Sequence, residues 1–149
     1  MSDTTTHPAL TTTTRATARR DRSVLHGTFV LAALSLGGAV IAVTTGLSAD
    51  VWEAMGPTGR LSIPIPMMVA QLVAAWLASG TRRRPAIVAS ALLALVEPVC
   101  ILSGFSDGGY SDPARTPLHV GYQVLFVAAI GVVGVLAARR LVLLLRRRA

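Results

Sequence analysis

Lysine is absent from this chain of 149 residues, acidic residues number only seven, and there is a single cysteine, Cys100. One cysteine excludes an intramolecular disulfide, a paired-cysteine redox site and a cysteine-rich zinc site. Aromatic residues make up 5% of the chain, so its arginines lack the interleaved aromatic residues that are typical of nucleic-acid sites. No glycine-rich phosphate loop, nucleophile elbow or His-Glu-x-x-His motif is present, which argues against an enzyme.

Four long apolar stretches occupy most of the remaining sequence, at about 24–47, 61–79, 86–103 and 118–138. At 1.5 Å per residue, a helix of roughly 18–24 residues is long enough to cross a hydrocarbon core of about 30 Å. The polar remainder is too short to form a second core. We therefore predict an all-α membrane protein, with a four-helix transmembrane bundle over residues 23–140.

Arginine is distributed unevenly around these stretches, and this predicts the orientation. Only Arg60 and Arg115 lie on one side, together with most of the acids outside the stretches. The other side carries Arg15, Arg19, Arg20, Arg22, Arg82, Arg83, Arg84, Arg139, Arg140, Arg146, Arg147 and Arg148. Because basic residues that flank spans stay in the cytoplasm, we expect both termini inside, in a multi-pass protein of the inner (plasma) membrane. The same arginines are predicted to contact anionic lipid headgroups.

The two ends of the chain are polar and basic. Residues 1–22 are rich in threonine and poor in apolar residues, which predicts a disordered cytoplasmic tail. A cleavable signal peptide is the alternative, but the apolar run that follows is about twice the usual length and predicts a retained anchor. Residues 141–149 place the short apolar run Leu141–Leu145 between arginines. We expect them to continue the fourth span as a helix at the inner surface, because five residues cannot span.

The second stretch contains Pro64 and Pro66 close to its start. Proline is tolerated in the first turn of a helix, where the backbone N–H groups have no partner within the helix. The helix is therefore predicted to begin at Pro64. Since it is short when counted to Ser79, we expect it to extend toward Arg82, with the arginines reaching the headgroups.

Small residues recur four positions apart on three of the stretches, which predicts where the helices pack. Such spacing allows two helix backbones to approach closely in lipid. The first stripe is Gly38, Ala42 and Gly46, the second is Ala70, Ala74 and Ala78, and the third is Ala86, Ser90 and Ala94.

Glu97 is the only acidic residue inside a stretch, and Pro98 follows it. An ionisable residue at that depth costs about 2.5–3.5 kcal/mol on insertion scales and usually faces the interior of the bundle. Pro98 cannot donate to the carbonyl of Ala94 and is predicted to kink the helix. Two interpretations stay open: Glu97 supports the kink by hydrogen bonding, or it serves proton coupling or ligand binding.

Three further residues complete the candidate intramembrane polar site. Counted from the inner ends of their spans, Gln71 is about 12 Å deep and Glu97 about 16 Å, so the two side chains are predicted to form a hydrogen bond. His119 and Gln123 share one face of the fourth stretch but lie nearer the outside. His26 and His119 are at opposite ends of their spans and cannot bind one haem iron. We therefore predict no metal and no cofactor.

Two groups of membrane proteins share some of these features. Small multidrug transporters also have four short helices and one embedded glutamate, but there the glutamate lies in the first helix. The chain more closely resembles small four-span actinobacterial membrane proteins of unknown function. The likeness rests on Thr81-Arg82-Arg83-Arg84 after the second span, Pro98 in the third and His119 at the start of the fourth. It implies the fold and the location, and no activity.

The sequence thus predicts a non-enzymatic component of the membrane: a partner subunit, or a small structural or binding protein. Its partners are then the bilayer and a membrane protein or a second copy of the chain. A small transporter or proton-coupled carrier that uses Glu97 is the alternative. An enzyme is disfavoured because the chain lacks a convergent set of acid, base and nucleophile.

Overall fold

The computed structural model describes residues 21–57, 61–106 and 115–146, and these ranges contain helices and no strand. The helices are α1 (Ser23–Thr44), α2 (Val51–Ala54), α3 (Ile65–Ala78), α4 (Arg83–Ser106) and α5 (Pro117–Arg146). The prediction of an all-α protein is therefore confirmed for this part of the chain. Most of the tail predicted to be disordered, together with Arg147 and Arg148, lies outside the described residues.

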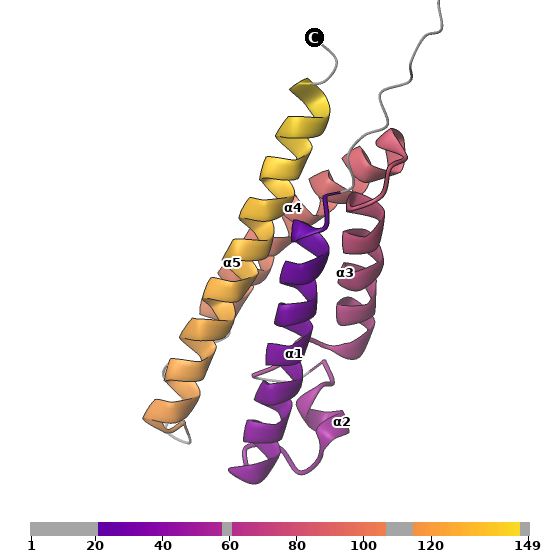
Figure 1. Ribbon diagram of the computed structural model, residues 1–149. Helices are drawn as coiled ribbons and strands as arrows, with labels where there is room; N and C mark the ends of the chain where they lie inside the picture. Colours follow the sequence, from indigo (N-terminus) through magenta and orange to yellow (C-terminus); the bar gives the residue numbers. More distant parts are fainter. Residues whose placement is uncertain (1–20, 58–60, 107–114, 147–149) are drawn as a thin grey trace, which may run out of the picture.

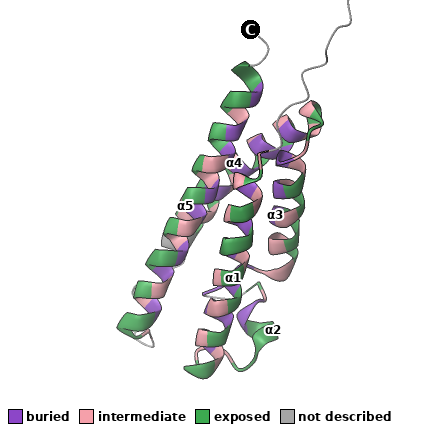
Figure 2. Cartoon of the chain, viewed as in Figure 1, coloured by how far each residue is buried: buried purple, intermediate pink, exposed green. Residues whose placement is uncertain are grey.

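Three of the helices, α1, α4 and α5, are long and apolar enough to cross a membrane. Their outer faces carry exposed residues (Figure 2). Many of these are large and apolar, including Leu95, Leu102 and Val135, which are 69, 66 and 68% exposed. Contiguous apolar surface of this kind is unusual in a protein surrounded by water, and it suits lipid. The chain is thus a membrane-embedded helical protein.

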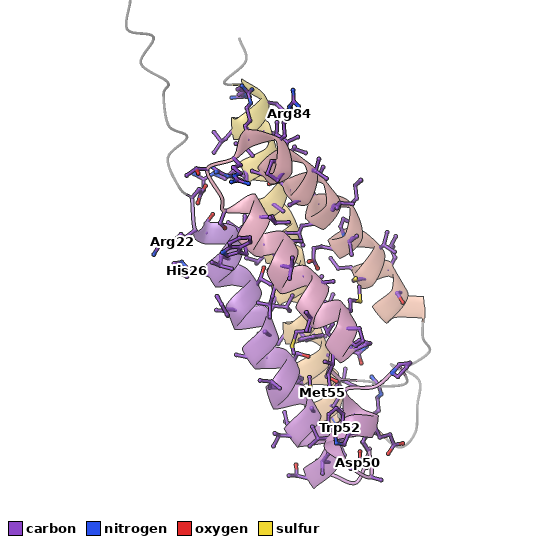
Figure 3. The ribbon with its side chains drawn as sticks, turned by 90° about the vertical axis from the view of Figure 1, so that its right-hand side faces the viewer. Arg22, His26, Asp50, Trp52, Met55 and Arg84 are labelled. Atoms are coloured by element: carbon purple, nitrogen blue, oxygen red, sulfur yellow. The ribbon has the colours of Figure 1, made fainter. Side chains whose placement is uncertain are left out.

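The four longer helices make a closed ring of contacts. α1 packs against α5, α5 against α4, α4 against α3, and α3 against α1. Figure 1 shows α1 and α3 side by side, with the short α2 at the far end of α1 and α5 running along the whole assembly. The start of α1, the end of α3, the start of α4 and the end of α5 therefore share one end, which we call the arginine-rich end. Figure 3 shows Arg84 toward this end and Asp50 and Trp52 at the opposite end.

α1 ends at Thr44, three residues before the predicted end of the first stretch. Gly46 has a positive φ of 74°, and the N–H of Leu47 donates to the carbonyl of Ala42 at 2.8 Å. The N–H of Gly46 donates to the carbonyl of Val43 at 3.1 Å. This pair of bonds is a Schellman cap, which stops a helix. The assignment of Gly46 to a packing stripe was wrong, because this glycine is exposed and ends the helix.

α3 is shorter than predicted. It begins at Ile65 with Pro66 in its first turn and Pro64 as the cap, which is close to the predicted start. It ends at Ala78 and does not reach Arg82, because Ser79 and Gly80 form the turn into α4. Fourteen residues give a helix of only about 21 Å, so this helix alone is too short for a hydrocarbon core of about 30 Å.

A non-helical segment, residues 61–63, precedes α3 and is buried in the protein. The N–H of Ile63 donates to Ser35 Oγ of α1 at 2.8 Å, and the hydroxyl of Ser62 donates to the carbonyl of Ala54. A Cβ on Gly38 of α1 would overlap the carbonyl of Leu61, so only glycine fits there. Non-helical backbone at membrane depth is tolerated when protein covers it and binds its polar groups.

The other two stripes of small residues are buried at one or two of their three positions. Ala78 of α3, and Ala86 and Ser90 of α4, are fully buried, whereas Ala70 is exposed. α5 continues as one helix past Ala138 to Arg146, in keeping with the predicted helical extension of the fourth span.

Candidate functional site

Glu97 lies on α4 in the interior of the assembly, with none of its surface exposed. Gln71 of α3 is also buried, and its Nε2 donates to Glu97 Oε1 at 3.1 Å. The structure therefore brings together the two residues that depth counting placed at similar levels. The second carboxyl oxygen, Oε2, is buried and has no hydrogen-bond partner in the described part of the chain.

Helical periodicity explains how the two side chains meet. Gln71, Ala75 and Ala78 are spaced as i, i+4 and i+7 and form the buried face of α3. Ser90, Leu93 and Glu97 are spaced as i, i+3 and i+7 and lie on the buried face of α4. Because α3 and α4 are neighbours, the two faces pack together and the two polar groups form a pair.

Two glycines on α5 allow α4 to approach closely near Glu97. A Cβ on Gly134 would lie 3.1 Å from the Cβ of Glu97, and a Cβ on Gly131 would lie 3.7 Å from Ile101 Cδ1. Pro98 is exposed on the outer face, and α4 runs through it as one helix. The glutamate thus faces the interior while the proline that follows it faces outward.

His119 belongs to a second polar cluster, near the start of α5. It is 2% exposed, and its Nδ1 accepts from the backbone N–H of Thr116 at 3.0 Å. Its Nε2 lies 2.8 Å from Thr45 Oγ1, and that hydroxyl lies 2.7 Å from the carbonyl of Ile41. A backbone N–H can only donate, so Nδ1 must be an acceptor and the ring proton is on Nε2. His119 therefore links the first turn of α5 to the end of α1.

Gln123 lies one turn further along α5 and accepts a hydrogen bond from Arg115. Neither His119 nor Gln123 reaches Glu97. Gln123 and Gly134, which contacts Glu97, are eleven positions apart on α5, or about 16 Å. The bulky side chains between the two levels belong to one apolar cluster, namely Leu31, Ile63, Phe126, Ile130 and Val133. The four predicted polar residues thus form two separate sites.

The arginines at the arginine-rich end are not equivalent. Arg82, Arg84, Arg139 and Arg146 are exposed, as expected for side chains that meet headgroups. Arg140 differs from this prediction: it is 3% exposed, and its Nε donates to the carbonyl of Ala78 at 3.3 Å. Its Nη2 lies 3.5 Å from the carbonyl of Gly80. Arg140 therefore binds the C-terminal carbonyls of α3, which carry partial negative charge.

Asp21 lies beside this group, just before α1. Burial raises the pKa of its carboxyl, but hydrogen bonds from Ser23 and the charges of Arg140 and Arg139 outweigh burial, so the pKa lies below its ordinary value. Its Oδ1 accepts from the N–H of Ser23 at 3.0 Å. Asp21 thus stays ionised near neutral pH and binds the N–H of the first residue of α1, which has no partner within the helix.

The described residues contain no group of three His, Cys, Asp or Glu side chains that could hold a metal ion. A comparison with known protein families finds no matching family model, and neither the curated proteins nor the solved structures give a match.

Sequence reasoning missed the contacts that join helix ends. Thr45 and Arg115 complete the cluster around His119 and Gln123, and Arg83 and Arg140 bind backbone carbonyls. The only signal for Arg140 is its position, seven residues after Val133 and three after Ala137, on the buried face of α5.

Proposed function

We propose that this chain spans the inner (plasma) membrane four times, with both termini in the cytoplasm. α3 and the buried non-helical segment before it, residues 61–63, together support a fourth span. The four residues before α3 add up to about 13 Å if extended, which brings the segment close to the thickness of the hydrocarbon core. Anionic lipid headgroups are then the partners of the exposed arginines.

Labelling of single cysteines tests whether α3 is a span. In a Cys100→Ser background, Asp50→Cys precedes α3 and Thr81→Cys follows it, and both positions are exposed. A membrane-impermeant thiol reagent should label Asp50→Cys on intact cells and Thr81→Cys only after permeabilisation. Labelling of both positions from one side would contradict four spans and leave α3 as a re-entrant segment.

Within the membrane, the protein acts as a small non-enzymatic subunit or binding protein. One observation carries this proposal: polar side chains in the middle of the helices, such as Ser35, Gln71 and Glu97, are buried, whereas the outer surface of the long helices is largely apolar. A polar pair that is buried in the interior supports packing between α3 and α4. An apolar outer face is what a membrane partner or a second copy would contact.

A complementation assay in a deletion strain tests this role. Ala70→Leu and Ala128→Leu place a larger side chain at exposed positions on α3 and α5. Both side chains remain apolar and compatible with lipid. At least one should abolish function, because a bulky side chain blocks helix contact, while Glu97→Gln should preserve it. Full function in both leucine variants would contradict a role through these two faces.

A proton-coupled carrier is the second candidate, and Glu97 Oε2 is the observation that favours it. A buried carboxyl oxygen without a partner is costly in a purely structural pair. Under this proposal Glu97→Gln should abolish function in a protein that remains folded, because glutamine has the shape of the side chain but no acidic proton. A functional Glu97→Gln protein would rule the carrier out.

A further inference from the structure

Four buried polar atoms without a hydrogen-bond partner lie on α3 and α4 or at their ends. They are Glu97 Oε2, Ser90 Oγ, Ser79 Oγ and Arg83 Nε. Glu97, Ser90 and Ser79 are at most 1% exposed. In the described part of the chain these atoms bind no other residue, although buried polar groups in proteins are normally paired.

Their positions form a line. Arg83, Ser90 and Glu97 are seven residues apart on α4, so they share one face and follow each other at about 10 Å intervals. Ser79 is at the end of α3, four residues before Arg83. The line therefore starts at Glu97, in the interior, and leads to the arginine-rich end along the side of α4 that is buried.

The two directions away from Glu97 differ in what surrounds them. Toward the opposite end stands the bulky apolar cluster that contains Leu31, Phe126 and Ile130. Toward the arginine-rich end, four of the six buried apolar residues are alanines, namely Ala75, Ala78, Ala89 and Ala137. Small side chains and hydroxyl groups give water both space and hydrogen-bond partners, whereas the bulky cluster gives neither.

We propose that water enters from the arginine-rich end along Arg83, Ser79 and Ser90 and reaches Glu97, and that the opposite side is closed. Water then binds the unpartnered oxygens. A hydronium ion from that end gives one proton to the Glu97 carboxylate and leaves as water, and the reverse step returns the proton to water. Access from one side extends the carrier proposal, and its biological use rests on that proposal. The water path itself is a property of the fold.

The charged and titratable groups around the path are few. α5 contributes Arg140 at the arginine-rich end, where Asp21, just before α1, lies beside it. α4 contributes Arg83 at that end and Cys100 beside Glu97, and α3 contributes the neutral amide of Gln71. Glu97 is therefore the one acidic group in the interior of the described path, whereas Asp21 lies at the arginine-rich entrance.

Thiol reactivity tests the path, since a hydrophilic reagent modifies a cysteine that water reaches. In the Cys100→Ser background, Ser90→Cys is compared with Ala89→Cys, which is also buried and one residue nearer the arginine-rich end. In membrane vesicles with that end exposed, Ser90→Cys should react at least several-fold faster than Ala89→Cys. Ile130→Cys, in the bulky cluster, should react from neither side.

Equal rates for the Ser90 and Ala89 variants, or faster reaction of Ser90→Cys from the opposite side, would overturn the proposal. Hydrogen–deuterium exchange followed by infrared spectroscopy gives a second measurement on the protein with native Cys100. The carboxyl band that Glu97→Gln removes should exchange more slowly in a Ser79→Ala/Ser90→Ala protein. Both experiments are independent of growth, so a silent Glu97→Gln phenotype would refute the carrier while leaving the path intact.

Discussion

Arg83 donates from Nη2 to the carbonyl of Leu144 at 2.8 Å, so the first residue of α4 binds the last turn of α5. Arg140 makes the matching contact from α5 to the end of α3. Both side chains act as caps for a neighbouring helix, because the last carbonyls of a helix have no partner within it. The arginine-rich end is therefore held together by side chain to backbone bonds as well as by packing.

Arg140→Ala should destabilise the protein by about 1.5–3 kcal/mol, the usual cost of losing a hydrogen bond to a charged group in a buried place. Arg139→Ala is the matched control, since this adjacent arginine is exposed and its loss should change stability by less than about 0.5 kcal/mol. Thermal unfolding of the purified protein in nanodiscs measures both. A similar loss in the two variants would show that charge, and not the contact with α3, is responsible.

The Gln71–Glu97 pair should show a coupling free energy of about 0.6 kcal/mol in a double-mutant cycle, the average for polar pairs within membranes, and no more than about 1.7 kcal/mol. The cycle uses Gln71→Leu, Glu97→Ala and the double variant. Unfolding in mild detergent gives the change in the free energy of unfolding for each of the three variants. Strict additivity would mean that the 3.1 Å contact contributes nothing to stability.

Glycine positions on α1 and α5 should respond differently to alanine. Gly38→Ala should cost at least about 1–3 kcal/mol, because the new methyl group would overlap the carbonyl of Leu61 and overpacking has that cost. Gly121→Ala should instead stabilise α5 by about 0.5–1 kcal/mol through its better helix propensity, since a Cβ there meets nothing within 4 Å. Thermal unfolding separates the two, and an unaffected Gly38→Ala protein would contradict the packing of residues 61–63 on α1.

His119 should carry its ring proton on Nε2, and Thr45→Val should remove the partner of that proton. We expect a loss of about 1 kcal/mol in stability and a changed ring ¹⁵N shift in NMR spectra of labelled protein. Thr44→Val is the control, because Thr44 bonds only to carbonyls of its own helix. An Nδ1–H tautomer in the unmodified protein would disprove the hydrogen-bond assignment.

The all-helical character was predictable because long apolar runs leave few other ways to satisfy the backbone in lipid. The Gln71–Glu97 contact could also be predicted, since a constant rise per residue converts sequence position into depth. Burial of Arg140 was not predictable in this way. An arginine at a helix end turns either to the headgroups or to a neighbouring helix. The choice depends on where the neighbouring helix ends and leaves its last carbonyls without a partner, and here α3 ends at Ala78.

The ends of α1 and α3 illustrate a related limit. Hydropathy does not mark the residue at which a helix stops, so the sequence predicted an extension of α3 toward Arg82, whereas the helix ends at Ala78. Gly46 likewise matched a packing stripe by its spacing, but the positive φ that it adopts as a cap is a local backbone property. Depth and polarity were therefore easier to predict than helix ends.

The segment before α3 also has a consequence for biogenesis. The N–H of Ile63 is satisfied by Ser35 of α1, and the backbone at Leu61 fits against Gly38 of the same helix. The second apolar segment therefore cannot complete its hydrogen bonding in lipid alone, and its stable insertion depends on α1 being in place. Synthesis from the N-terminus supplies α1 first, so the order of the chain is also the order in which the membrane can accept it.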